Sequence, residues 1–350
     1  MKRFIALLIG LALLGAVAAY ADLGAVWEAL GRLGPAGALA IVAIYLVSFV
    51  VDTASWQLML PSTRRTAGWL YRLTKIRLVG EAFNVVIPAG TLGGEPVKAI
   101  LLKRAHGLGY HEGAASLIIA KTVNLLALIA FCAVGLVLLW RTPALAGGFG
   151  VVSGAGLGLL ARGVVGFYAV QRRRVSSRLA RWLSRHSLGS GLVRFLEEIE
   201  EVDDRLVAFY TGRPGAFAAA LALAFSNWLI TTAELYLIMW LLGYPVSWGE
   251  AWMIETAAQL VRAGAFLIPG GLGASEAVMV LILDALAGRP ALGLALALAR
   301  RGREALWIAW GMWLAWLYAL SPAEVSSLTL APAPATRKRP AAPDSATGEP

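Results

Sequence analysis

The sequence predicts an all-α protein that crosses a membrane several times, and three observations support this fold class. The residue types AVILMFWYC make up 59% of the 350 residues, whereas a soluble domain reaches about 45–50% apolar residues only when glycine is also counted. Charged residues make up only 15% of the chain, and its mean hydropathy is +0.70. A single soluble core cannot bury so much apolar surface, and a disordered chain is far less apolar. The composition therefore excludes a disordered protein and disfavours a soluble enzyme.

Apolar runs between charged residues predict about six full transmembrane helices, because one span needs about 20 predominantly apolar residues. The six runs are 4–20, 36–60, 114–140, 147–170, 214–242 and 292–320. Two further apolar stretches, 79–102 and 251–287, are interrupted by Pro and Gly residues. We interpret the first run as a retained helix rather than as a cleaved signal peptide, because another span follows directly.

The distribution of Lys and Arg predicts the orientation, since these residues resist translocation in short loops. Segment 61–80 has five such cations and segment 171–185 has six, and neither contains an acidic residue. These two segments, the N-terminus and the basic tail at 337–339 are therefore predicted to lie in the cytoplasm. Topology and attraction to anionic headgroups account for the net charge of +10, so the sequence predicts no nucleic-acid partner.

The chain is predicted to consist of a membrane domain, residues 1–320, and a C-terminal tail, residues 321–350. Within the membrane domain, segment 171–213 is predicted to be cytoplasmic, because it is basic at its start and then has apolar residues at helical spacing among acidic ones. The tail is rich in Ala, Pro, Ser and Thr and has little to bury, so we expect it to be disordered.

Two Pro-Gly segments indicate an internal repeat. Residues 87–102 read IPAGTLGGEPVKAILL and residues 268–283 read IPGGLGASEAVMVLIL, and six of the sixteen positions are identical at an offset of 181 residues. In each segment a proline, which cannot donate a helical hydrogen bond, precedes several glycines and a glutamate. This pattern predicts two short half-helices that meet at a break, as in a re-entrant hairpin, within half-repeats centred on 79–140 and 251–320. Ordinary turns between helices are the alternative interpretation.

The predicted orientation makes this repeat an inverted one. The first hairpin enters from the cytoplasmic side, and the second follows three full spans later and enters from the outside. Paired segments interrupted by Gly and Pro indicate a transport site between two repeats. Glu81 and Arg262 occupy equivalent positions at the same offset and have opposite charges. We hypothesise that these two side chains meet, or that together they bracket a zwitterionic headgroup.

Ionisable residues at membrane depth are costly, so they usually face a charged partner or a wet cavity. The candidate binding residues are the glycines and prolines of the two hairpins together with polar residues of neighbouring helices. They are Glu81, Asn84, Pro88, Gly90, Gly93, Gly94, Glu95, Lys98, Lys121, Asn124, Glu255, Gln259, Arg262, Pro269, Gly270, Gly271, Gly273, Glu276, Arg300, Arg301 and Glu304. For each of the charged residues, a structural ion pair is the alternative role.

The sequence predicts no catalytic centre, no metal site and no cofactor. The three histidines, His106, His111 and His186, belong to no HExxH pattern. Cys132 is the only cysteine, which excludes a CxxC redox centre, a zinc ribbon and an intramolecular disulfide. The phosphate-loop pattern GxxxxGK[ST] is also absent. The sequence therefore favours binding over catalysis.

Three segments together resemble a known family: GEAFNVVIPAGTLGGEPVKAILLKR at 80–104, LVRAGAFLIPGGLGASEAVMVLIL at 260–283 and ALALARRGRE at 295–304. They are similar to the bacterial flippase-like family, which comprises the membrane domain of lysylphosphatidylglycerol synthetases and its stand-alone relatives. The resemblance covers roughly residues 1–320, and it is strongest to the branch associated with hopanoid biosynthesis. It implies a multi-pass protein of the bacterial inner membrane whose partners are phospholipids or polycyclic lipids and enzymes that make envelope lipids.

The resemblance and the polar residues lead to the same functional prediction. The protein is expected to move a lipid, or a lipid-linked envelope precursor, across the bilayer while a polar cleft between the hairpins holds the headgroup. We expect lysyl transfer not to be inherited, because only the low-complexity residues 321–350 follow the last predicted span. Two alternatives belong to other functional classes: a scaffold of an envelope-lipid pathway that transports nothing, and an integral-membrane enzyme that modifies a lipid.

Overall fold

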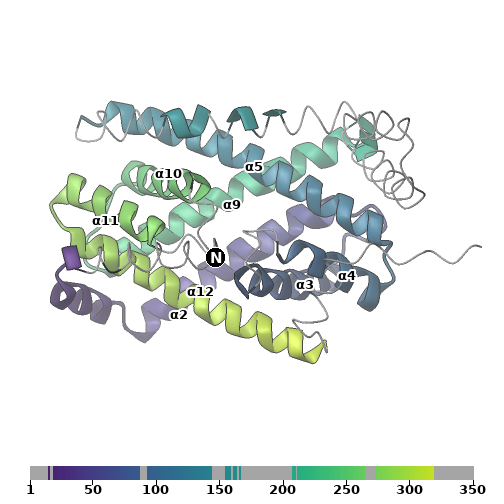
Figure 1. The fold of residues 1–350 in the computed structure, drawn as a ribbon, viewed down its shortest axis with the longest axis horizontal. Coiled ribbons are helices and arrows are strands. Elements are labelled where there is room, and N and C mark those ends of the chain that lie inside the picture. The colour runs from purple at the N-terminus through teal and green to yellow at the C-terminus, as the bar shows by residue number, and fades with distance from the viewer. Residues whose placement is uncertain are drawn as a thin grey trace, which may run out of the picture.

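The computed structural model describes residues 15, 19–86, 93–143, 154–158, 161–163, 165–166, 207–209, 211–264 and 273–318. Throughout this part of the chain the regular elements are helices (Figure 1). The main ones are α2 (Leu23–Leu58), α3 (Ala67–Val86), α4 (Glu95–His106), α5 (Tyr110–Arg141), α9 (Pro214–Leu241), α10 (Trp248–Gly264), α11 (Ala274–Ala287) and α12 (Pro290–Leu317). The prediction of an all-α membrane protein is therefore confirmed.

Three of these helices, α2, α5 and α9, are long and apolar enough to cross a membrane. They overlap the predicted spans 36–60, 114–140 and 214–242, and α12 overlaps the predicted span 292–320. The Pro-Gly breaks fall between α3 and α4 and between α10 and α11, but their centres lie outside the described residues. Also outside them are the tail and most of the spans 4–20 and 147–170 and of segment 171–213, so those predictions stay untested.

Local sequence signals explain several helix ends. The Asp22 side chain accepts hydrogen bonds from two backbone N–H groups in the first turn of α2, as an N-cap does. Gly34 adopts a φ of 58° just before Pro35, and these two residues kink α2. Helices α4 and α11 each end at a glycine with a left-handed backbone, Gly107 and Gly288.

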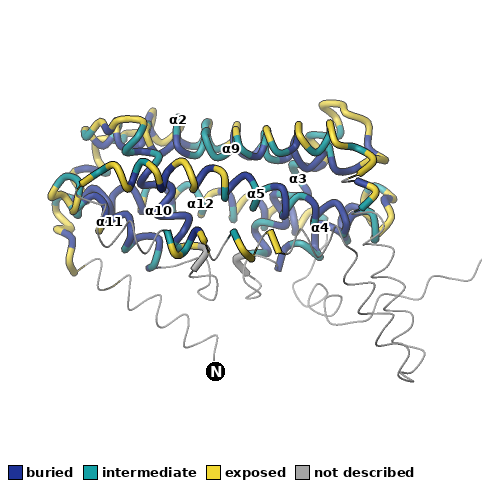
Figure 2. Tube along the Cα trace, turned by 90° about the horizontal axis from the view of Figure 1, so that it is seen from above, coloured by how far each residue is buried: buried dark blue, intermediate teal, exposed yellow. Residues whose placement is uncertain are grey.

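Helices α2 and α9 pack side by side and antiparallel along one side of the molecule (Figure 2). Ser48 Oγ donates a hydrogen bond to Asn227 Oδ1 at 2.6 Å, near the middle of the contact. Toward the C-terminal end of α2, Ser55 Oγ donates to the backbone oxygen of Ala220 at 2.9 Å. Because the partner's number falls as the residue number in α2 rises, the two helices run in opposite directions.

The helix contacts of the first half recur in the second half when α2–α5 are matched in order to α9–α12. Helix α3 packs against α2, α4 and α12, and its counterpart α10 packs against α9, α11 and α5. Helix α5 packs against α4 and α9, and its counterpart α12 packs against α11 and α2. Each half therefore contributes its last helix to the other half.

Two glycines allow these exchanged helices to approach closely. A Cβ atom at Gly135 on α5 would collide with the Thr256 side chain on α10. A Cβ atom at Gly311 on α12 would collide with the backbone oxygen of Leu78 on α3. Small residues of this kind let helix backbones pack directly against one another within membranes.

We expect Gly311→Ala to lower the free energy of unfolding by about 1–3 kcal/mol, because the added methyl overpacks the contact between α12 and α3. Gly302→Ala is the matched control, since that glycine lies on the same helix and an added Cβ meets nothing within 4 Å. The control should be neutral or stabilising, because Ala favours the helix over Gly. Melting curves of the purified chain in detergent measure both effects, and equal shifts would contradict the close approach.

Candidate functional site

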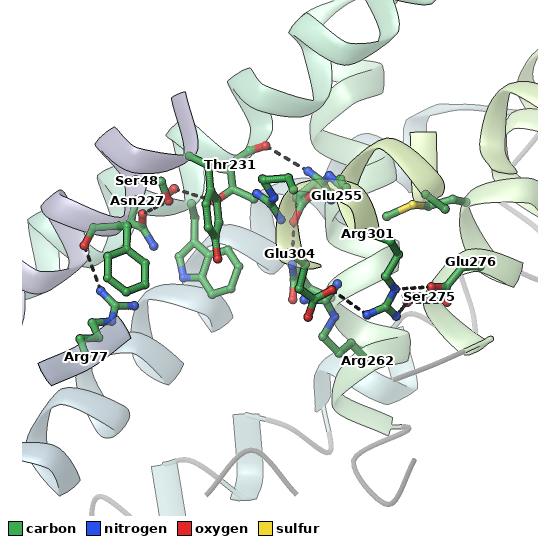
Figure 3. Close-up of a pocket in the computed structure, with 18 residues that line it drawn as sticks. Ser48, Arg77, Asn227, Thr231, Glu255, Arg262, Ser275, Glu276, Arg301 and Glu304 are labelled. Carbon is green, nitrogen blue, oxygen red and sulfur yellow. Dashed lines mark hydrogen bonds and ion pairs between the residues drawn. The ribbon is translucent and has the colours of Figure 1, made fainter. Parts of the chain in front are cut away.

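A cavity of about 200 Å³ lies between α2, α3, α9, α10, α11 and α12 (Figure 3). A cavity of this size can hold several water molecules or a small polar group. Its lining combines aromatic residues with charged ones. It comprises Tyr45, Ser48, Phe49, Arg77, Asn227, Trp228, Thr231, Glu255, Gln259, Arg262, Ser275, Glu276, Met279, Ala297, Arg300, Arg301, Arg303 and Glu304.

Two buried carboxylates neutralise two of the arginines of α12. Arg300 Nη1 lies 2.7 Å from Glu255 Oε2, and Arg300 Nη2 lies 3.8 Å from Glu234 Oε2 and donates to the backbone oxygen of Thr231. Arg303 Nη1 donates to both oxygens of Glu234, at 2.7 and 2.8 Å. Glu234 and Glu255 are almost fully buried, so these charges need partners to offset the loss of water.

Arg301 connects α12 to α11. Its Nε donates to Glu276 Oε1 at 2.6 Å, and its Nη1 donates to Glu304 Oε2 at 2.7 Å. Ser275 Oγ donates to the other Glu276 oxygen at 2.8 Å. Glu276 lies in the first turn of α11, where the positive end of the helix dipole further favours a carboxylate.

Arg262, near the end of α10, differs from the other arginines of the lining. Its side chain is exposed, whereas Arg300 is buried. Within the described residues no carboxylate lies within ion-pair distance of Arg262. Figure 3 shows it below Glu304 and Arg301, at the charged end of the cavity.

The opposite end of the cavity is aromatic. Tyr45 and Phe49 come from α2 and Trp228 comes from α9, so both central helices contribute. The Arg303 guanidinium lies 3.6 Å from the centre of the Tyr45 ring, and the Arg77 guanidinium lies 4.5 Å from that of Phe49. These cation–π contacts add to the ion pairs that hold both arginines in place.

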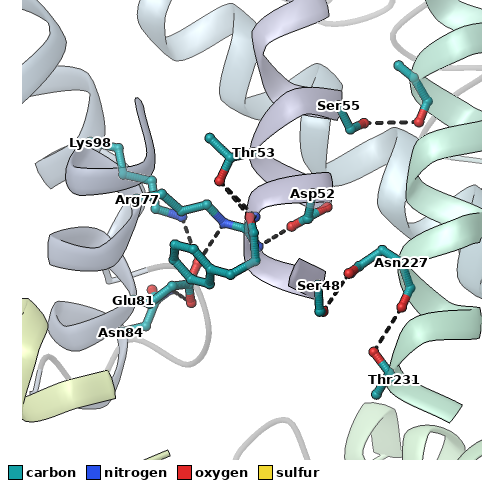
Figure 4. A network of polar contacts seen from close by, with 12 residues as sticks. Ser48, Asp52, Thr53, Ser55, Arg77, Glu81, Asn84, Lys98, Asn227 and Thr231 are labelled. Atoms are coloured by element: carbon teal, nitrogen blue, oxygen red, sulfur yellow. Dashed lines mark hydrogen bonds and ion pairs between the residues drawn. The ribbon is translucent and has the colours of Figure 1, made fainter. Parts of the chain in front are cut away.

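A second polar cluster, in the first half, surrounds Lys98 (Figure 4). Lys98 Nζ lies 2.9 Å from Glu81 Oε1 and 3.0 Å from Glu95 Oε1. Asn84 donates to Glu81 Oε2 at 3.0 Å and accepts a hydrogen bond from the backbone N–H of Gly94 at 2.7 Å. Lys98 is 5% exposed, so it fills the interior of the first half.

Arg77 lies between this cluster and the cavity. It forms an ion pair with Asp52 on α2, and its Nε lies 3.9 Å from Glu81 Oε1. It also donates to the backbone oxygen of Phe49 at 3.2 Å. Arg77 also lines the cavity. Its side chain therefore connects the polar cluster around Lys98 to the charged residues of the cavity.

Comparison with protein families gives a match over residues 3–320 to the lysylphosphatidylglycerol synthase TM region. The chain belongs to this family. Neither the curated proteins nor the solved structures give a significant match. Membership in the family and the long apolar helices make the chain a membrane protein linked to lipid handling. The family match does not assign it to the hopanoid-associated branch, so that assignment stays a prediction.

The cavity brings together one third of the candidate residues named from the sequence. Those in its lining are Glu255, Gln259, Arg262, Glu276, Arg300, Arg301 and Glu304. Those gathered around Lys98 in the first half are Glu81, Asn84, Glu95 and the N-cap residue Gly94. Their role in binding stays a prediction.

The remaining candidates lie elsewhere. Lys121 and Asn124 are on α5 and are not part of the cavity lining. Gly93 directly precedes Gly94, the N-cap residue of α4, and Gly273 is the N-cap residue of α11. The candidates outside the described residues are Pro88, Gly90, Pro269, Gly270 and Gly271. Among the described residues no group of three or more His, Cys, Asp or Glu side chains could hold a metal ion.

The structure does not bring Glu81 and Arg262 into contact. Glu81 pairs with Lys98 and approaches Arg77 instead, because both cations belong to its own half. The hypothesis of a direct bridge between the two equivalent positions is therefore wrong for this conformation. Of the two residues, only Arg262 lines the cavity, and Glu81 belongs to the polar cluster around Lys98.

Sequence reasoning missed several residues of the lining. Tyr45 and Phe49 lie on an apolar span that has no obvious polar signal, and Arg77 was interpreted as a topology signal. A helical wheel would have identified Tyr45 and Phe49 as candidates. Tyr45, Ser48, Phe49 and Asp52 recur at intervals of three and four residues, so they lie on one face of a helix together with polar residues.

Proposed function

We propose that the protein moves a lipid between the two leaflets by admitting its headgroup to the cavity while the lipid tails stay in the bilayer. The main support is the cavity itself, which is lined by buried ion pairs between helices of a membrane protein. Charged groups are rare at membrane depth and usually mark a pathway or a binding site. Under this proposal the location is a bacterial inner membrane and the partners are membrane lipids.

The lining can lower the barrier to headgroup passage for a simple physical reason. A polar headgroup that enters hydrocarbon loses its hydrogen bonds to water, and each unmatched group costs several kcal/mol. Fixed guanidinium and carboxylate groups can replace that water. They need little reorganisation, because ion pairs such as Arg300 with Glu255 and Arg301 with Glu276 already hold them.

The repeated packing supports an inverted repeat. If α2–α5 and α9–α12 are equivalent, α2 and α9 are counterparts, and these two helices contact each other, for example through Ser48 and Asn227. Two equivalent helices that touch must lie beside the symmetry axis. Because α2 and α9 are antiparallel, that axis crosses them and inverts one half relative to the other. Transporters built from inverted repeats bind their substrate near such an axis.

The two halves differ in how they fill the space beside this axis. In the second half the charged side chains border the cavity, whereas in the first half Lys98 occupies the space between Glu81 and Glu95. We propose that this difference reflects one of two alternating states, with the second half open and the first half closed.

Lipid movement in proteoliposomes tests the proposed function. The full chain is reconstituted with a trace of fluorescent phospholipid, and a membrane-impermeant quencher reports the fraction of probe that reaches the outer leaflet. We expect faster exchange than in protein-free vesicles, with retention of this activity in the control variant Arg65→Gln, whose side chain is exposed outside the cavity. No exchange above the protein-free rate would overturn the proposal, and a lipid of altered mass would indicate an enzyme instead.

Cysteine accessibility tests the inverted arrangement separately. In a Cys132→Ala background, which removes the buried native thiol, single cysteines at positions 93 and 273 are labelled with a membrane-impermeant reagent. We expect position 93 to react from the cytoplasmic side and position 273 from the outside. Labelling of both positions from the same side would contradict the inverted repeat and leave a parallel one.

A further inference from the structure

The lining of the cavity includes hydrogen-bond donors without acceptors. Arg262 has no ion-pair partner within the described residues, and its exposed guanidinium carries five N–H donors. Arg300 Nε, Arg303 Nε and Trp228 Nε1 also lack a hydrogen-bond partner in the described structure, but these three atoms have almost no accessible surface. All four residues line the same cavity. A ligand that only accepts hydrogen bonds would satisfy the accessible guanidinium of Arg262.

The charges on the cavity surface have an excess of positive sign. Five arginines and three glutamates belong to the described lining. The difference arises because Asp52 and Glu234, which pair with Arg77 and Arg303, are not part of the lining themselves. An anion inside the cavity is therefore closer to guanidinium groups than to the carboxylates behind them.

We infer that the cavity binds the phosphate of a net anionic lipid headgroup, and that the Arg262 guanidinium is its main contact. This inference rests on the proposed lipid-moving function and adds the chemical class of the substrate. A phosphodiester has two unesterified oxygens, accepts hydrogen bonds and donates none, and its geometry matches the planar fork of arginine. The glycerol-sized remainder of a headgroup would lie toward Asn227 and Trp228.

The neighbours of Arg262 support a binding role over a structural one. Arg300 is 7% exposed and is fixed by Glu255, and Arg301 is fixed by Glu276 and Glu304, so neither has to move to form the site. Arg262 lies beside them, lines the cavity and is left out of their ion pairs. A structural arginine in this position would be expected to share one of these carboxylates.

Binding in detergent tests the inference without requiring lipid movement. The purified full chain is titrated with short-chain phosphatidylglycerol, phosphatidylethanolamine, glycerol phosphate and inorganic phosphate, and binding is followed by calorimetry. We expect phosphatidylglycerol to bind best and Arg262→Gln to weaken its binding about tenfold or more, as for the loss of a charged hydrogen bond. Arg262→Lys should give an intermediate loss, because it keeps the charge and loses the fork. Arg65→Gln, the control, should bind normally.

Other results would overturn the inference in distinct ways. Equal binding of phosphatidylethanolamine would show that net charge is not recognised, and equal binding of inorganic phosphate would assign the site to free phosphate compounds. Unchanged binding in Arg262→Gln, with an unchanged melting temperature, would remove Arg262 from the site. If the wild-type chain binds phosphatidylglycerol but exchanges no lipid in vesicles, the proposed function fails while the inference stands.

Discussion

Arg300→Met should destabilise the protein by about 3–5 kcal/mol, because it leaves the fully buried Glu255 carboxylate without its ion-pair partner. The double variant Arg300→Met with Glu255→Leu should recover most of this loss, since two apolar residues of similar size can replace a buried ion pair. Thermal unfolding in detergent gives the comparison. Glu28→Gln is the control, because its pair with Arg32 is exposed and should contribute little.

The same variants separate folding from binding. A double variant that melts like the wild type and exchanges no lipid would assign the pair Arg300 and Glu255 to the cavity's function. A single variant as stable as Glu28→Gln would contradict the buried ion pair. Equal losses in the single and double variants would mean that packing of the long side chains, and not their charge, stabilises this contact.

The fold class was predictable because membrane composition and helix length are strong signals. The apolar runs that became α2, α5 and α9 contain few charges, so their helices follow directly from the need to satisfy backbone groups within lipid. Helix α12 overlaps the predicted span 292–320, but it is not among the three described helices that are long and apolar enough to cross a membrane, because charged residues such as Arg300 and Arg301 interrupt it. The pairing of α2 with α9 was not predictable, because it includes contacts such as Ser48 with Asn227, and the sequence does not show which residue of another helix Ser48 meets.

The candidate site was predictable only in part. Charges at membrane depth are costly, so Glu255, Arg262 and Glu276 stood out as candidates from their positions alone. Which charges pair with which depends on the helix packing. Lys98 is close to Glu81 because α4 packs back on α3, a contact that equivalent positions in a repeat do not reveal. The aromatic end was missed because Tyr45 and Phe49 resemble ordinary residues of a span.

Lys98→Met should cause a second large loss of stability, because two carboxylates then lose the cation between them. Lys98 is 6% exposed at its side chain, so water cannot readily replace it. Combining Lys98→Met with Glu81→Gln should show coupling of about 0.5–3 kcal/mol, as for residues in direct contact. Melting curves of the wild type, the two single variants and the double variant measure this coupling as a double-mutant cycle.

A second double-mutant cycle, on Glu81 and Arg262, tests whether these two residues come into contact in solution. These residues do not touch in the structure, so Glu81→Gln and Arg262→Gln should be additive within about 0.3–0.5 kcal/mol. If the two halves exchange their open and closed states, we expect the detergent-solubilised chain to rest in the state that the structure shows, with Lys98 between Glu81 and Glu95. Strong coupling between Glu81 and Arg262 would contradict this resting state. It would mean that the dominant conformation in solution brings the equivalent positions of the two halves together.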